Sequence, residues 1–113
     1  MSRHSISMNN VYTIGHQIRT LREKEEMPLR KLASLLDVDQ STLSKIERDE
    51  RKANLKMIED LSNIFNVDRN ELLVNYYSDI ISYQIEEEND YAKILKIAEA
   101  KIKYKRSIKS EEK

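Results

Sequence analysis

Residues 29–48, LRKLASLLDVDQSTLSKIER, decide the fold of this chain. Apolar residues recur at helical spacing on both sides of a short polar break at Asp37, which predicts two helices that share one core. Ala33 is small enough to let the two helices cross closely. Asp37 is one of the few residue types besides glycine that tolerate the left-handed conformation needed in the turn. With Leu43 and Ile46 pointing inward, the other side chains of the second helix must face outward.

The outward side of that second helix carries short polar and hydrogen-bond-donating side chains. They are Gln40, Ser41, Ser44 and Lys45. All four lie towards the N-terminal end of the predicted helix. This is the end that contacts base edges when two helices joined in this way bind the major groove of DNA.

The rest of the chain also indicates helices. It holds a single glycine, a single proline and much Leu, Ile, Lys and Glu, so we expect an all-α protein with short connections. Residues that favour helix N-caps precede the apolar periodic stretches, and Pro28 suits the first turn of a helix. These N-cap candidates are Thr13, Asp39, Asn54, Asp68 and Asp90. Asn66 suits a left-handed helix end.

The periodicity divides the chain into four segments. We expect a mobile arm over residues 1–12, a compact helical domain over 13–75, a C-terminal helical extension over 76–108 and a disordered tail over 109–113.

Composition narrows the class of protein. The chain has no cysteine, which excludes disulfides, thiolate zinc sites and cysteine nucleophiles. The sequence lacks a signal peptide and an apolar run long enough for a bilayer, so we expect a soluble cytoplasmic protein with no membrane partner. His4 and His16 are the only histidines and stand far apart from other ligand types, so we expect no metal site.

Charge gives no general attraction to nucleic acid. Lys and Arg number 20, as do Asp and Glu, and the formal net charge is zero. Between Met27 and Met57, cations outnumber anions locally, by seven to five. A DNA-binding protein with this balance must rely on a few well-placed contacts rather than on a basic field.

Residues 29–48 resemble the helix-turn-helix of the Xre/Cro family of phage repressors and bacterial regulators. The resemblance extends from about Ile14 to Leu73. It includes IRTLRE at 18–23, STLSKIER at 41–48 and LSNIFNVDRNELL at 61–73. It implies a five-helix, repressor-like helix-turn-helix domain that binds DNA to control transcription without a cofactor.

The resemblance also implies roles for individual residues. The family's base-reading positions fall on Gln40, Ser41, Ser44 and Lys45. Gln can pair with adenine through two hydrogen bonds, and Lys can donate to guanine. The family pairs an arginine of the first helix with a glutamate late in the third. Here these are Arg22 and Glu47, and we expect a partly buried ion pair that fixes the tilt of the third helix.

Phosphate contacts are expected around the base-reading helix. The resemblance assigns one to Arg51, and Lys52 lies beside it. Backbone N–H groups at the start of the second helix, at Leu29 and Arg30, can meet another phosphate, and Thr42 can touch a phosphate or a thymine methyl group.

The chain departs from the family pattern at three positions. The family often has Gln, Gly and Pro where this chain has Leu29, Asp49 and Ala53, respectively. The first change puts a phosphate contact in doubt, the second adds a negative charge near the DNA backbone, and the third leaves the loop less rigid.

Most of the tyrosines lie beyond the segment that resembles the family. Tyrosine buries a large area while its hydroxyl stays wet, which favours interfaces. We therefore expect the extension to form a homodimer interface, so that two domains read two halves of an inverted repeat. The predicted interface residues are Tyr76, Tyr77, Ile80, Ile81, Tyr83, Tyr91, Ile94, Leu95 and Ile102.

Three classes of function were weighed. The first is a sequence-specific regulator that binds double-stranded DNA, acting as a homodimeric repressor or autoregulator, of which a restriction–modification controller is one form. The second is a protein-interaction module, such as an antitoxin or anti-regulator with an unknown protein partner, in which DNA binding is secondary. The third, an enzyme, lacks a glycine-rich phosphate loop or a catalytic constellation, and we do not expect it.

Overall fold

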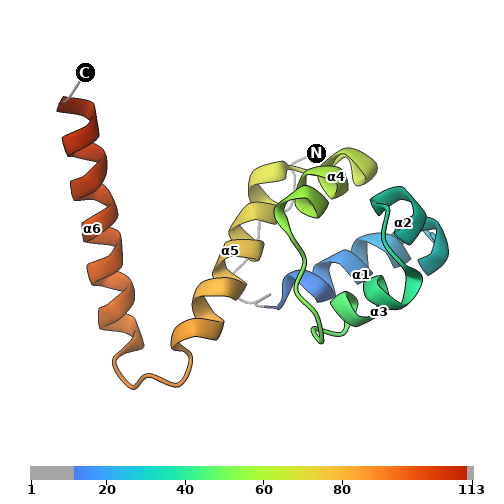
Figure 1. Cartoon of the computed structure of the whole chain (residues 1–113), viewed down its shortest axis with the longest axis horizontal. Coiled ribbons are helices and arrows are strands. Elements are labelled where there is room, and N and C mark those ends of the chain that lie inside the picture. Colours follow the sequence, from blue (N-terminus) through green and yellow to red (C-terminus); the bar gives the residue numbers. More distant parts are fainter. Residues whose placement is uncertain (1–11, 112–113) are drawn as a thin grey trace. The chain divides into compact units, whose positions relative to one another are not determined.

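The computed structural model describes residues 12–111, and every regular element among them is a helix (Figure 1). The all-α prediction is confirmed. The six helices are α1 (Ile14–Lys24), α2 (Leu29–Leu36), α3 (Gln40–Glu47), α4 (Leu55–Phe65), α5 (Arg69–Ile85) and α6 (Tyr91–Glu111).

The chain forms two compact units, which divide between Ile80 and Ile81. The first unit holds α1 to α4 and most of α5, and the second holds the end of α5 and α6. The division lies beyond the predicted one after residue 75 because the last turns of α5 in the first unit still bond to α1. Asn75, with 5% of its surface exposed, donates to Gln17 (2.7 Å), and Asp79 accepts from the backbone N–H of Ile14 (2.8 Å).

One apolar core holds the first unit together. Every helix of the unit contributes to it, and removal of these side chains from water is its main source of stability. The buried apolar residues are Ile14, Ile18, Leu32, Ala33, Leu36, Leu43, Ile46, Met57, Ile58, Leu61 and Leu72. Around this core, α3 packs on α1 and α2, and α4 packs on α2.

Local sequence signals set most helix ends. The Thr13 hydroxyl accepts from the N–H of His16 (3.1 Å), and the Asn54 side chain accepts from the N–H of Met57 (2.9 Å), as N-caps do. Asn66 ends α4 with φ of 53°, in the left-handed region. Pro28 is the N-cap of α2 rather than a residue of its first turn, and its carbonyl accepts from the N–H of Lys31.

The second unit corrects one predicted boundary. Helix α6 continues to Glu111, so residues 109–111 are helical where a disordered tail was expected. Several lysines in the last turns favour this longer helix because cations stabilise a helix C-terminus. The predicted N-terminal arm lies outside the described residues, except Tyr12, whose ring packs against His16 with centroids 4.7 Å apart.

Candidate nucleic-acid interface

The turn between α2 and α3 has the geometry that the sequence required. Asp37 adopts φ of 59° and ψ of 45°, and the N–H of Val38 donates to the carbonyl of Ala33 (3.0 Å). Ala33 is buried at the contact between the helices, where a larger side chain would push them apart. The turn thus brings α3 across α2 with its first residues at the surface (Figure 1).

Helix α3 separates an apolar side from a polar side. Leu43 and Ile46 are buried in the core. Three predicted base-reading residues are exposed on the other side, and the fourth, Ser44, is half-buried. The exposed three are Gln40, Ser41 and Lys45. The structure thus brings the four predicted residues together on one helix. Three lie on its outward side, and Ser44 lies at the edge of that side.

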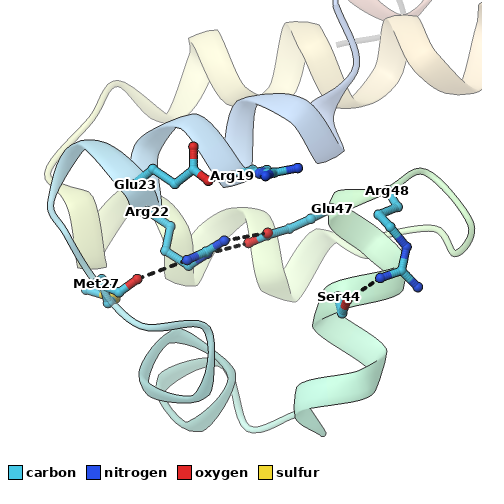
Figure 2. A network of polar contacts seen from close by, with 7 residues as sticks. All are labelled: Arg19, Arg22, Glu23, Met27, Ser44, Glu47 and Arg48. Atoms are coloured by element: carbon cyan, nitrogen blue, oxygen red, sulfur yellow. Dashed lines mark hydrogen bonds and ion pairs between the residues drawn. The ribbon is translucent and has the colours of Figure 1, made fainter.

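An ion pair locks the C-terminal end of α3 to α1. The Arg22 guanidinium donates to both carboxylate oxygens of Glu47, at 2.8 and 2.9 Å, and to the carbonyl of Met27 (3.0 Å) (Figure 2). The side chains of Arg22 and Glu47 are only 14% and 5% exposed, respectively. The hydrogen bond to Glu47 raises the pKa of Arg22, although desolvation opposes the shift. This predicted ion pair is confirmed, and its two parallel bonds fix the orientation of α3.

The predicted phosphate-binding residues lie at two places around α3. Leu29 is half-buried and Arg30 exposed at the start of α2, whereas Arg51 and Lys52 are exposed in the loop after α3. Arg51 and Thr42 also line an open hollow with the two carboxylates of Asp37 and Asp39 and with Ser34 and Val38. Those carboxylates partly offset the charge of Arg51.

Sequence reasoning missed Arg48. Its guanidinium donates to the Ser44 hydroxyl, which is one of the predicted base-reading groups (Figure 2). It also forms an ion pair with Glu50 (3.0 Å). The spacing of four residues between Ser44 and Arg48 places both on the same side of a helix. That spacing is the signal that would have revealed the contact from the sequence.

The predicted dimer residues lie on α5 and α6. Tyr76 and Ile80 are half-buried, and Tyr76 packs against the core of its own unit, which accounts for part of its burial. The remaining seven are exposed, and they are Tyr77, Ile81, Tyr83, Tyr91, Ile94, Leu95 and Ile102.

Among residues 12–111, no helix combines the length and apolar character needed to cross a membrane. The same residues bring together no group of three or more His, Asp or Glu side chains suited to a metal ion.

The fold and the exposed polar side of α3 define a class, the DNA-binding transcriptional regulators of the helix-turn-helix type. A family model described as "Helix-turn-helix" matches residues 18–72. The chain belongs to the helix-turn-helix family, in its Xre/Cro type.

Solved structures of similar proteins include the N-terminal DNA-binding domain of SinR from Bacillus subtilis. It is 31% identical over 53% of this chain and 88% of that domain, with a TM-score of 0.48. The restriction-modification controller protein C.AhdI from Aeromonas hydrophila is 26% identical over 57% of this chain and 97% of its own, with a TM-score of 0.49.

The clp gene regulator ClgR from Corynebacterium glutamicum is 20% identical over 75% of this chain and 88% of its own, with a TM-score of 0.50, which speaks to the fold alone. No curated protein sequence matches the chain.

Proposed function

We propose that this regulator binds a specific inverted repeat in double-stranded DNA as a homodimer, with α3 of each copy in the major groove. One observation carries the proposal. The buried Leu43 and Ile46 together with the Arg22–Glu47 ion pair hold α3 so that Gln40, Ser41 and Lys45 face solvent. A helix held rigidly with donors and acceptors on its outer side can read base edges without first ordering its own backbone.

Each residue of this surface has a proposed task. Gln40 pairs with adenine, Lys45 donates to guanine, and Ser41 and Ser44 contact neighbouring base edges. Phosphate contacts come from backbone N–H groups at Leu29 and Arg30 and from the side chain of Thr42. The cations Arg51 and Lys52 make further phosphate contacts. All of these contacts fix the register of the protein on DNA without reading sequence.

Homodimerisation through the exposed apolar residues of α5 and α6 completes the proposal. One α3 in one groove makes few base contacts, whereas two copies read two half-sites about one helical turn apart. Binding at a promoter then blocks transcription, so we propose a repressor or an autoregulator, of which a restriction–modification controller is one form.

Selection of bound oligonucleotides from a random pool tests this proposal directly. The expected result is an enriched inverted repeat, and the absence of any enriched sequence would contradict it. On the selected site, Lys45→Ala should weaken binding by about 1–3 kcal/mol and relax preference at one position in each half-site. Arg51→Ala should weaken binding to all sequences alike and flatten the salt dependence.

A matched control separates these effects from a general loss of charge. Arg69 at the start of α5 is a surface cation paired with Glu59. Arg69→Ala removes the same charge and should leave both affinity and sequence preference unchanged. If Lys45→Ala behaved like Arg69→Ala, Lys45 would not read a base.

The second candidate function is a protein-interaction module in which DNA binding is secondary. The zero net charge and the exposed tyrosines Tyr77, Tyr83, Tyr91 and Tyr104 favour it. It predicts a protein partner at one-to-one stoichiometry together with no retention on DNA at physiological salt. Sequence-specific retention on DNA by the protein alone would contradict it.

A further inference from the structure

Helix α6 carries a large amount of exposed apolar surface. None of its 21 residues is buried. Six large apolar side chains are exposed, namely Tyr91, Ile94, Leu95, Ile97, Ile102 and Tyr104. Most of the stability of a protein helix comes from packing of its apolar face. These exposed apolar side chains therefore indicate a partner.

Part of this surface has the spacing of a helix-pairing seam. Tyr91, Leu95, Ala98 and Ile102 follow one another at intervals of four, three and four residues. The alternation of three and four keeps side chains on one line of a helix, as in coiled coils. Continued by three residues towards the C-terminus, the same line meets Lys105, whereas Glu88 lies three residues before Tyr91 in the turn that precedes α6.

Charge along this segment is largely sorted by sign, with Lys93, Lys96, Glu99 and Glu111 as the exceptions. The turn before α6 contains Glu86, Glu87, Glu88 and Asp90. The C-terminal half of α6 contains Lys101, Lys103, Lys105, Arg106 and Lys109. The two groups lie roughly 20 Å apart along the helix, at 1.5 Å per residue, which exceeds the Debye length of about 8 Å at physiological salt. Each end therefore presents its own charge to a partner.

We propose that α6 pairs with α6 of a second copy of this chain in antiparallel orientation, along the line from Tyr91 to Lys105. This inference rests on the homodimer of the proposed function and adds its orientation and its charge recognition. The register that sets Tyr91 against Ile102 of the second copy, and Leu95 against its Ala98, also brings the turn that contains Glu88 to the end of the second copy's α6 that contains Lys105. Because the pairing is two-fold symmetric, every contact occurs twice. A parallel pair would instead place Glu88 on Glu88 and Lys105 on Lys105.

A charge-swap experiment on the full chain tests the orientation. Self-association of the parent, Glu88→Lys, Lys105→Glu and the double variant E88K/K105E is measured by sedimentation velocity across a concentration series. Each single variant places like charges at both ends of the antiparallel pair, so we expect the dimer to weaken roughly tenfold. The double variant restores opposite charges and should dimerise like the parent. Lys96→Glu, on the polar side of α6, is the matched control and should leave the dimer unchanged.

Cross-linking provides a second readout that does not depend on charge. Because the chain has no cysteine, Tyr91→Cys and Ile102→Cys each introduce a single thiol. Under oxidation, a mixture of the two variants should give a disulfide-linked dimer that neither gives alone, with circular dichroism confirming that both fold.

The outcomes separate this inference from the function on which it rests. A parent dimer that is insensitive to both single reversals, or cysteine variants that each cross-link to themselves, would overturn the antiparallel pairing and leave the DNA-binding dimer standing. A parent that stays monomeric at all concentrations would overturn both. If the sorted charges only complemented the helix dipole of a single chain, the reversals would lower helicity without changing the dimer constant.

Discussion

At the scale of single residues, Glu50 holds a cation beside the proposed base-reading residues. Its carboxylate holds Arg48, whose guanidinium also bonds to Ser44. The hydrogen bond to Glu50 raises the pKa of Arg48. We expect Glu50→Gln to release Arg48 for a phosphate, to tighten DNA binding several-fold and to steepen the salt dependence by about 0.9 in log–log slope.

The measurement is affinity for the selected site at several salt concentrations. Glu23→Gln is the matched control because it removes the same charge and frees Arg19 from a comparable exposed ion pair on α1. Equal effects of the two variants would show that net charge alone, and not Arg48, sets the change.

Gly15 is the single glycine of the chain, and its position permits no side chain. A Cβ atom there would meet the backbone carbonyl oxygen of Ile46 and a carboxylate oxygen of Asp49. Backbone at the end of α3 cannot yield without moving the helix, so Gly15→Ala should destabilise the protein by about 1–3 kcal/mol, as overpacking does. Urea unfolding followed by circular dichroism measures this, and an unchanged midpoint would show that α1 and α3 can separate slightly at no cost.

At the scale of elements, the Arg22–Glu47 ion pair joins α1 to α3. Glu47→Ala leaves the Arg22 guanidinium largely buried without its carboxylate, so we expect a loss of about 2–3 kcal/mol in the free energy of unfolding. The affinity of the folded variant for DNA should also fall, beyond the loss that its unfolded fraction accounts for, because α3 loses its fixed tilt. Urea unfolding and affinity at a temperature where the variant is folded check both effects. Glu23→Ala, which breaks an exposed pair, should change stability little.

Asp79 of α5 makes the junction between α5 and α1 sensitive to pH. Burial raises the pKa of Asp79, and the negative charge of Asp49 adds to the rise, while the hydrogen bond from the N–H of Ile14 opposes it. Because the pKa is higher in the folded state than in the unfolded state, protonation of Asp79 favours folding. This contribution is complete below the unfolded pKa of about 3.9 and is lost as pH rises through the raised value.

We therefore expect Asp79→Asn to be more stable than the parent at pH 7, because the amide oxygen still accepts from Ile14 without a buried charge. The difference in thermal midpoint should shrink as pH falls towards 4, since the parent then becomes neutral at this position. A difference that stays constant from pH 7 to pH 4 would assign the effect to something other than this ionisation.

The elements that the sequence predicted are those set by local chemistry. Thr13, Asp37, Asn54 and Asn66 act on their own backbone or on residues three or four positions away, so the local pattern reveals them. The Arg22–Glu47 pair was predicted only because a family resemblance supplied it. The bond from Ile14 to Asp79 spans 65 positions, and no local signal marks it. For the same reason, no local pattern indicates that the first compact unit extends to Ile80.

At the scale of the whole molecule, the buried core and the proposed α6 pairing belong to different parts of the chain. The buried apolar core lies wholly between Ile14 and Leu72, whereas α6 buries no residue. A chain that ends after Ile85 keeps the complete core and every described polar bond between α1 and α5. It should therefore unfold at the same denaturant concentration as the full chain when both are dilute.

Binding to the inverted repeat should respond differently. Without α6, the copies lose the α6 part of the proposed interface and join less tightly away from DNA, so the second half-site is filled less often from an effectively high local concentration. We expect affinity for the inverted repeat to fall on the order of 100-fold, while affinity for an isolated half-site stays unchanged. Mobility-shift titrations on both DNAs distinguish these effects. Unchanged binding of the shortened chain to the inverted repeat would place the dimer contact within the first unit, because α6 would then contribute nothing to it.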